Sequence, residues 1–75
     1  MFSGEIQKTL RKEGFDLESN EENIWIKEER DQSVTISGLG EDIDVIWQNF
    51  DGDFEEFSSQ SLKAILEWAN EKLNK

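Results

Sequence analysis

The fold is decided between residues 24 and 47, which read IWIKEERDQSVTISGLGEDIDVIW. Apolar residues recur at every second position in three short runs of this stretch: Ile24 and Ile26, then Val34 and Ile36, then Ile43, Val45 and Trp47. An alternation with a period of two is typical of strands. The segments between the runs are too short for a crossover connection, so neighbouring strands must be antiparallel. We therefore predict an antiparallel meander at the centre of the chain.

The residues before this meander predict a helix that begins after Ser3 and ends before Gly14. Serine is a favoured N-cap, and three apolar residues fall on one side of the predicted helix: Phe2, Ile6 and Leu10. Glycine readily adopts the left-handed conformation that ends many helices. Phe15 follows at the position whose side chain contacts the helix in a Schellman ending, so the end of this helix is well defined.

The period of two resumes after this helix. Phe15 and Leu17 alternate with acidic residues, and the polar segment 19–23 separates them from residues 24–26. This pattern predicts a hairpin. On its second strand, Trp25 lies on the face opposite Ile24 and Ile26 and is difficult to place in the core. We expect Trp25 to be partly exposed, either as a binding anchor or as a lid over the sheet edge.

Residues 48–57 carry two conflicting signals. Asp51 and Gly52 form a favoured hairpin turn, whereas Phe50, Phe54 and Phe57 recur at the helical spacing of four and three. We expect a short hairpin or an irregular loop here. The three phenylalanines either pack under the last helix or, lying among acidic residues, dock on a basic and apolar groove of a partner.

A second helix is predicted near the C-terminus, capped by Ser58 or Ser59. Its apolar residues form one stripe: Leu62, Ile65, Leu66, Ala69 and Leu73. Trp68 falls roughly 110° from the centre of this stripe at 100° per residue, so we expect it to be partly exposed. The whole pattern predicts an α+β fold, with a small antiparallel sheet of three to four strands flanked by an N-terminal and a C-terminal helix.

The length limits the chain to one domain. A domain of 75 residues buries only about 60% of the surface of its unfolded chain, which suffices for a single core. We therefore expect one acidic α+β domain over residues 1–75. The start of the chain lacks the basic flank and the apolar run of a signal peptide, and cysteine is absent. These features predict a cytoplasmic protein without a membrane segment.

Negative charge is concentrated in the middle of the sequence. The chain has 18 acidic and 8 basic residues and a net charge of −10. Residues 13–57 hold fifteen of the acids against only Lys27 and Arg30. If both helices cover one face of the sheet, the opposite face and its turns carry these acids. Proteins that bind nucleic acid need a basic footprint, so we expect no direct binding of nucleic acid.

The residue types disfavour catalysis and the binding of a cofactor. The chain has no His, Cys or Tyr, and general acid–base catalysis usually relies on histidine. The acidic turn at residues 51–56 does not have the calcium-ligand spacing of an EF-hand. Gly38 and Gly40 precede Glu41 and Asp42, which would repel a phosphate. We expect a protein that is not an enzyme and that binds neither a metal nor a cofactor.

The segregated acids favour a protein-binding inhibitor or regulator. Its acidic face would imitate nucleic acid and occupy the basic surface of a nucleic-acid-handling protein. In size and charge the chain resembles small phage proteins of the anti-defence or host-takeover type. The alternative is a generic interaction module or accessory subunit whose acidity serves solubility. The predicted partner-binding residues are Glu21, Glu22, Trp25, Glu28, Glu29, Glu41, Asp42, Asp44, Asp51, Asp53, Glu55 and Glu56.

Overall fold

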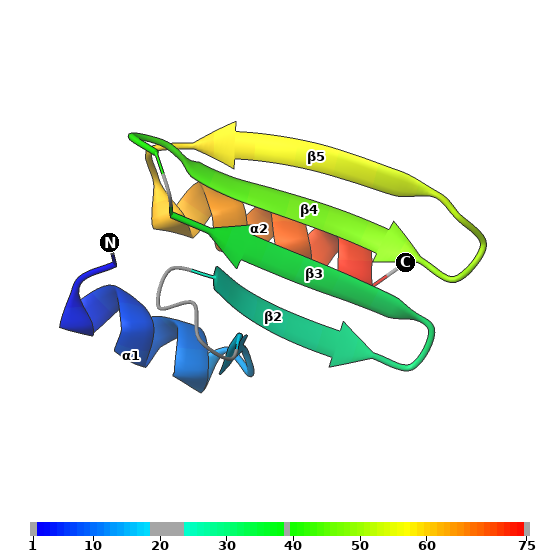
Figure 1. The fold of residues 1–75 in the computed structure, drawn as a ribbon, viewed down its shortest axis with the longest axis horizontal. Helices are drawn as coiled ribbons and strands as arrows, with labels where there is room; N and C mark the ends of the chain where they lie inside the picture. Colours follow the sequence, from blue (N-terminus) through cyan, green and yellow to red (C-terminus); the bar gives the residue numbers. More distant parts are fainter. Residues whose placement is uncertain (1, 19–23, 39, 75) are drawn as a thin grey trace.

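An antiparallel sheet forms the centre of the computed structural model, which describes residues 2–18, 24–38 and 40–74 (Figure 1). The strands follow one another in space in the order in which they occur in the chain. The elements are α1 (Gly4–Lys12), β1 (Asp16–Leu17), β2 (Ile24–Glu29), β3 (Gln32–Ser37), β4 (Ile43–Asn49), β5 (Phe54–Ser59) and α2 (Leu62–Leu73). The α+β class and the antiparallel meander are thus confirmed.

The sheet has five strands rather than the expected three to four. The additional strand is β5, which pairs antiparallel with β4 so that Val45 lies opposite Phe57. It arises from the segment whose phenylalanines are also spaced as in a helix. Backbone pairing along β4 outweighs that spacing, and the expected hairpin forms around Gly52, whose φ is 94°. Pairing through Ser59 also moves the N-cap of α2 to Ser61, beyond the predicted Ser58 or Ser59.

Local signals at the ends of α1 act as the sequence predicts. The Ser3 hydroxyl accepts a hydrogen bond from the Ile6 N–H at 3.3 Å. At the other end Gly14 has a φ of 93°, and the Phe15 N–H donates to the Leu10 carbonyl at 2.9 Å. This is the bond that defines a Schellman ending. It turns the chain so that Phe15 enters the core beside Leu10.

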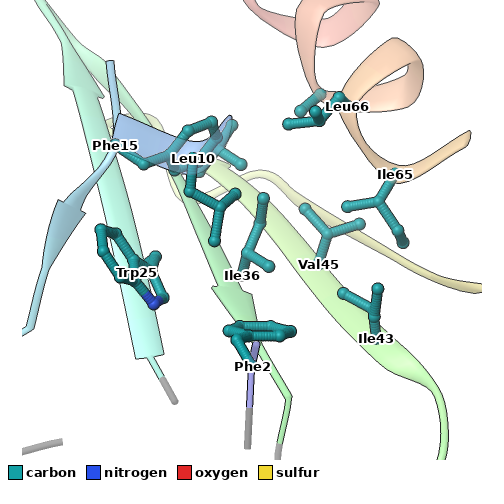
Figure 2. Packing of buried hydrophobic residues seen from close by; sticks show 11 residues of the cluster. Phe2, Leu10, Phe15, Trp25, Ile36, Ile43, Val45, Ile65 and Leu66 are labelled. Atoms are coloured by element: carbon teal, nitrogen blue, oxygen red, sulfur yellow. The ribbon is translucent and has the colours of Figure 1, made fainter. Parts of the chain in front are cut away.

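Both helices pack on the same face of the sheet. Figure 2 shows Leu10 and Phe15 from the N-terminal segment, and Ile65 and Leu66 from α2, over the face that carries Val45. The buried residues of the two helices and of this face form one cluster. The other face of the sheet is left uncovered and is called the open face below.

Trp25 faces the helices, and the expectation that it is partly exposed is wrong. It is fully buried, whereas Ile24 and Ile26 lie on the open face and are only partly buried. The reason is the position of α1 and Phe15 beside β2 (Figure 2). Burying an indole beneath this layer removes more apolar surface than burying either isoleucine. The guanidinium of Arg11 lies over the ring, 5.4 Å from its centre.

The other uncertain tryptophan is half-buried. Trp68 stacks on Phe57 with ring centres 5.7 Å apart and an interplanar angle of 13°. Phe57 thus packs against the last helix, as one of the two interpretations of the phenylalanines requires. Among the described residues, neither helix is long and apolar enough to cross a bilayer.

Candidate functional site

The open face is built from alternate residues of the five strands. Residues directly opposite each other on neighbouring strands have Cβ atoms about 4.5–5.5 Å apart, so aligned residues form rows across a sheet. Three rows cross the open face: Ile24, Ser37, Asp44 and Ser58; then Asp16, Ile26, Thr35, Ile46 and Glu56; then Glu28, Ser33, Gln48 and Phe54. The middle of the face is therefore apolar or neutral, and carboxylates lie toward its margins.

The open face and the loops around it carry almost all of the net negative charge. In the part of the chain that the structure describes, the open face and the loops at the ends of the sheet together have ten carboxylates and one cation, Arg30. The carboxylates are Asp16, Glu18, Glu28, Asp31, Glu41, Asp42, Asp44, Asp51, Asp53 and Glu56.

The helix side is close to neutral. Among the described residues it has six acids and six cations: Glu5, Glu13, Glu29, Glu55, Glu67 and Glu71 against Lys8, Arg11, Lys12, Lys27, Lys63 and Lys72. The two ion pairs found in this part of the chain, Lys27 with Glu29 and Lys72 with Glu55, also lie on the helix side. The helices and the helix-facing residues of the sheet are thus neutral together, and the net negative charge lies on the open face and in the loops at the ends of the sheet.

Seven of the predicted partner-binding residues lie on the open face or in the loops at the ends of the sheet. Glu28, Asp44 and Glu56 point from strands of the open face. Glu41 and Asp42 lie in the loop between β3 and β4, and Asp51 and Asp53 lie in the loop between β4 and β5; all four are exposed.

Three predicted residues are placed elsewhere. Glu29 and Glu55 extend from the helix-facing side of the sheet, where each pairs with a lysine. Trp25 is buried and reaches neither surface. Strand alternation, which sends neighbouring side chains to opposite faces, accounts for these three positions. Glu21 and Glu22 lie outside the described residues.

An open hollow of about 590 Å³ lies beside β4 and β5. Its open-face lining combines the carboxylates of Asp44 and Glu56 with the apolar side chain of Ile46, and Ser37 and Ser58 add hydroxyl groups. Lysine and arginine side chains have an apolar stem and a charged end. The hollow is complementary to such a side chain, with Ile46 for the stem and two carboxylates for the charge.

Two phenylalanines of the open face were not among the predicted site residues. Phe50 is 83% exposed and Phe54 is 65% exposed. The expectation that the phenylalanines pack under the last helix holds for Phe57 and is wrong for these two. In a strand, residues three apart point to opposite faces, so Phe54 must face away from Phe57. Recognising β5 in the sequence would have revealed this exposure.

The loop that carries Phe50 is held by hydrogen bonds. The Asn49 side-chain oxygen accepts from the N–H groups of Asp51 and Asp53, at 3.0 Å each. The Phe50 N–H donates to the Asp31 carbonyl at 3.0 Å, which continues the pairing of β3 with β4 by one residue. Phe50 lies two residues after Gln48 in the same ladder, so its side chain points to the open face, as that of Gln48 does. The ring is therefore displayed from an ordered backbone.

Comparison of the chain with protein-family models, with curated proteins and with solved structures gave no match. Within residues 2–18, 24–38 and 40–74, no group of three or more metal-ligating side chains is arranged to hold a metal ion. The open face must therefore be interpreted from its own shape, charge and exposed side chains.

Proposed function

We propose that this chain is a non-catalytic binding protein whose open face occupies a basic surface of a nucleic-acid-handling protein and so inhibits or regulates it. The division of charge carries this proposal. A net charge of about 2 to 8 keeps a small domain soluble, and solubility alone does not require the acids to gather on one side. Ten carboxylates on the open face and in the loops at the ends of the sheet form a surface suited to lysine and arginine.

Such a surface competes with nucleic acid on the same physical terms. A protein that binds nucleic acid neutralises phosphates with lysine and arginine, and the released counterions make its affinity fall with salt. Asp44 and Glu56, diagonal neighbours on β4 and β5, offer the same cations an alternative pair of negative groups. The hollow beside Asp44, Ile46 and Glu56 gives one such cation a defined place.

Charge reversal at the hollow tests the proposal. The chain is immobilised, exposed to a lysate of the cells that encode it, and washed with rising salt. We expect retained proteins that bind DNA or RNA, release by a few tenths molar salt, and inhibition of their nucleic-acid binding by the free chain. Asp44→Lys combined with Glu56→Lys should weaken retention by roughly tenfold or more.

The matched control places the same charge change on the other side of the molecule. Glu67→Lys with Glu71→Lys alters two exposed residues of α2 and should leave retention nearly unchanged. Equal losses in the two double variants would show that net charge alone matters. Retained proteins that do not bind nucleic acid would contradict the proposal.

The exposed apolar residues of the open face favour a second candidate function, an interaction module whose acidity only serves solubility. Ile46 is 36% exposed and Phe54 is 65% exposed, so the middle of the face can bind a partner through apolar contacts. Salt separates the two functions. Binding through apolar contacts should persist when salt is raised, because screening weakens interactions between charges.

A further inference from the structure

The two exposed rings have no counterpart in a duplex. Double-stranded nucleic acid hides its bases and presents phosphates, so a protein that grips its backbone meets charge rather than flat apolar groups. Phe50 and Phe54 nevertheless have 83% and 65% of their surface exposed. Exposed apolar side chains that gather in one place mark interaction sites, and these two lie in and directly after the loop between β4 and β5.

The rings and the acids lie at the same end of the open face. Phe54 lies opposite Gln48 in the row that also carries Glu28, and Phe50 extends the β4 ladder by one residue past Asn49. Asp51 and Asp53 flank the rings in the loop, where Asn49 holds the backbone. Because the loop is ordered before binding, displaying the rings costs little conformational entropy.

Resting on the function proposed above, we propose that the partner is a protein whose basic surface binds single-stranded nucleic acid, and that Phe50 and Phe54 occupy its base-stacking positions. Surfaces that bind single strands combine a positively charged groove for the backbone with aromatic side chains on which successive bases stack. The end of the open face offers the complementary set, carboxylates in place of phosphates and two flat rings in place of bases.

A second copy of this chain does not fit the same surface. Two open faces brought together would place their carboxylates against each other, and like charges across an interface are unfavourable. Among the described residues of the open face and of the loops at the ends of the sheet, Arg30 is the single cation, so it cannot compensate for them. Charge complementarity requires a basic partner, and the rings require one with exposed aromatic surfaces.

The test uses elution from two DNA columns. Proteins from a lysate of the cells that encode the chain are bound to single-stranded DNA-cellulose and, in parallel, to duplex DNA-cellulose. Each column is then eluted at low salt with the purified chain. We expect elution from the single-stranded column, and roughly a tenfold or greater loss of potency for Phe50→Ser with Phe54→Ser, because each base–aromatic stacking contact is a substantial part of the affinity.

Two controls separate the causes of failure. Leu17→Ser changes another exposed apolar residue, 39% exposed on the opposite edge strand, and should leave elution unchanged. Thermal melting should show that the phenylalanine double variant remains folded, since both rings lie outside the core. Eluted proteins are then assayed directly with a fluorescent single-stranded oligonucleotide.

Each outcome decides between the two proposals. Elution from the single-stranded column that depends on the rings supports the inference. Elution only from the duplex column, or elution that the phenylalanine variant preserves, overturns the inference and leaves the proposed function standing. No elution from either column, with the same result for the variants, overturns the proposed function and the inference with it.

Discussion

Gly38 is the residue at which the N-terminal segment closes over the sheet. A Cβ atom at this position would lie 2.5 Å from Cε1 of Phe2, a ring that is only 5% exposed. Gly38→Ala should therefore displace Phe2 and lower the free energy of unfolding by about 1–3 kcal/mol, as overpacking does elsewhere. Urea denaturation followed by tryptophan fluorescence measures this change.

Gly40 provides the matched control for this prediction. It has no atom within 4 Å of its ideal Cβ position, so Gly40→Ala should change the free energy of unfolding by less than about 0.5 kcal/mol. If the two alanines cost the same, Phe2 does not pack on Gly38 in solution.

At the scale of single residues, the sequence predicts features that depend only on neighbouring positions in the chain. Ser3 and Gly14 bound α1 as expected, because a cap needs only the adjacent turn. The face of Trp25 could not be predicted in the same way. Alternation shows that β2 has two different faces, but the choice of the buried one depends on α1, which reaches β2 only through the tertiary fold.

The hairpin of β4 and β5 depends on Asn49. Its side-chain oxygen accepts hydrogen bonds from two backbone N–H groups of the loop. Among the described residues, no other side chain accepts a hydrogen bond from these two groups. Asn49→Ala should lower the free energy of unfolding by about 1 kcal/mol and speed amide hydrogen exchange at Asp51 and Asp53. Nuclear magnetic resonance measures both effects.

The control for this element is Gln48→Ala. Gln48 is exposed on the open face, one residue before Asn49, and exchange at Asp51 and Asp53 should stay slow when it is replaced. Unchanged exchange in Asn49→Ala would show that other contacts order the loop, and the preorganised display of Phe50 would lose its basis.

Among the elements, β5 was the one that the sequence left open, because residues 48–57 allow a short hairpin or an irregular loop. It is an edge strand, bonded on one side only, and five of its six residues are either exposed or polar. Edge strands need little apolar surface and often carry charge. Glu55 and Glu56 are adjacent and lie on opposite faces, which removes the alternation that marks a half-buried strand. The exposure of Phe54 was hidden for the same reason.

The molecule as a whole should gain stability from salt. Its net charge is −10, and the acids of the open side have few cations near them. Monovalent salt screens this repulsion over a Debye length of about 8–10 Å. The melting temperature should therefore rise between low salt and roughly 0.2 M sodium chloride, as thermal circular dichroism would show.

The variant with Asp44→Lys and Glu56→Lys sharpens this prediction. Two reversals relieve repulsion within the open face, so the variant should melt higher than the original chain at low salt and respond less to added salt. Its partner binding should fall at the same time. A melting temperature indifferent to salt in both proteins would show that the acids are compensated within the fold.

At the scale of the whole molecule, the sequence predicts that the sheet face without helices is negative, but it does not predict the identity of a partner. The charge of residues 13–57 and the two terminal helices together imply that the sheet face without helices is negative. This argument needs only composition and topology. The arrangement within the face, with rings at one end and a hollow between Asp44 and Glu56, depends on strand register and loop conformation, which the sequence alone does not determine.

The neutrality of the helix layer makes the molecule an electric dipole. Its net charge lies away from the two helices, on the open face and in the loops at the ends of the sheet, in a body with a longest dimension of 33 Å. In the field of a basic partner such a body experiences a torque, which turns the negative side forward before the surfaces touch. Random orientation is the main reason that ordinary protein encounters fail to produce binding. If the open face binds the proposed basic partner, the helices help recognition by leaving their own side without net charge.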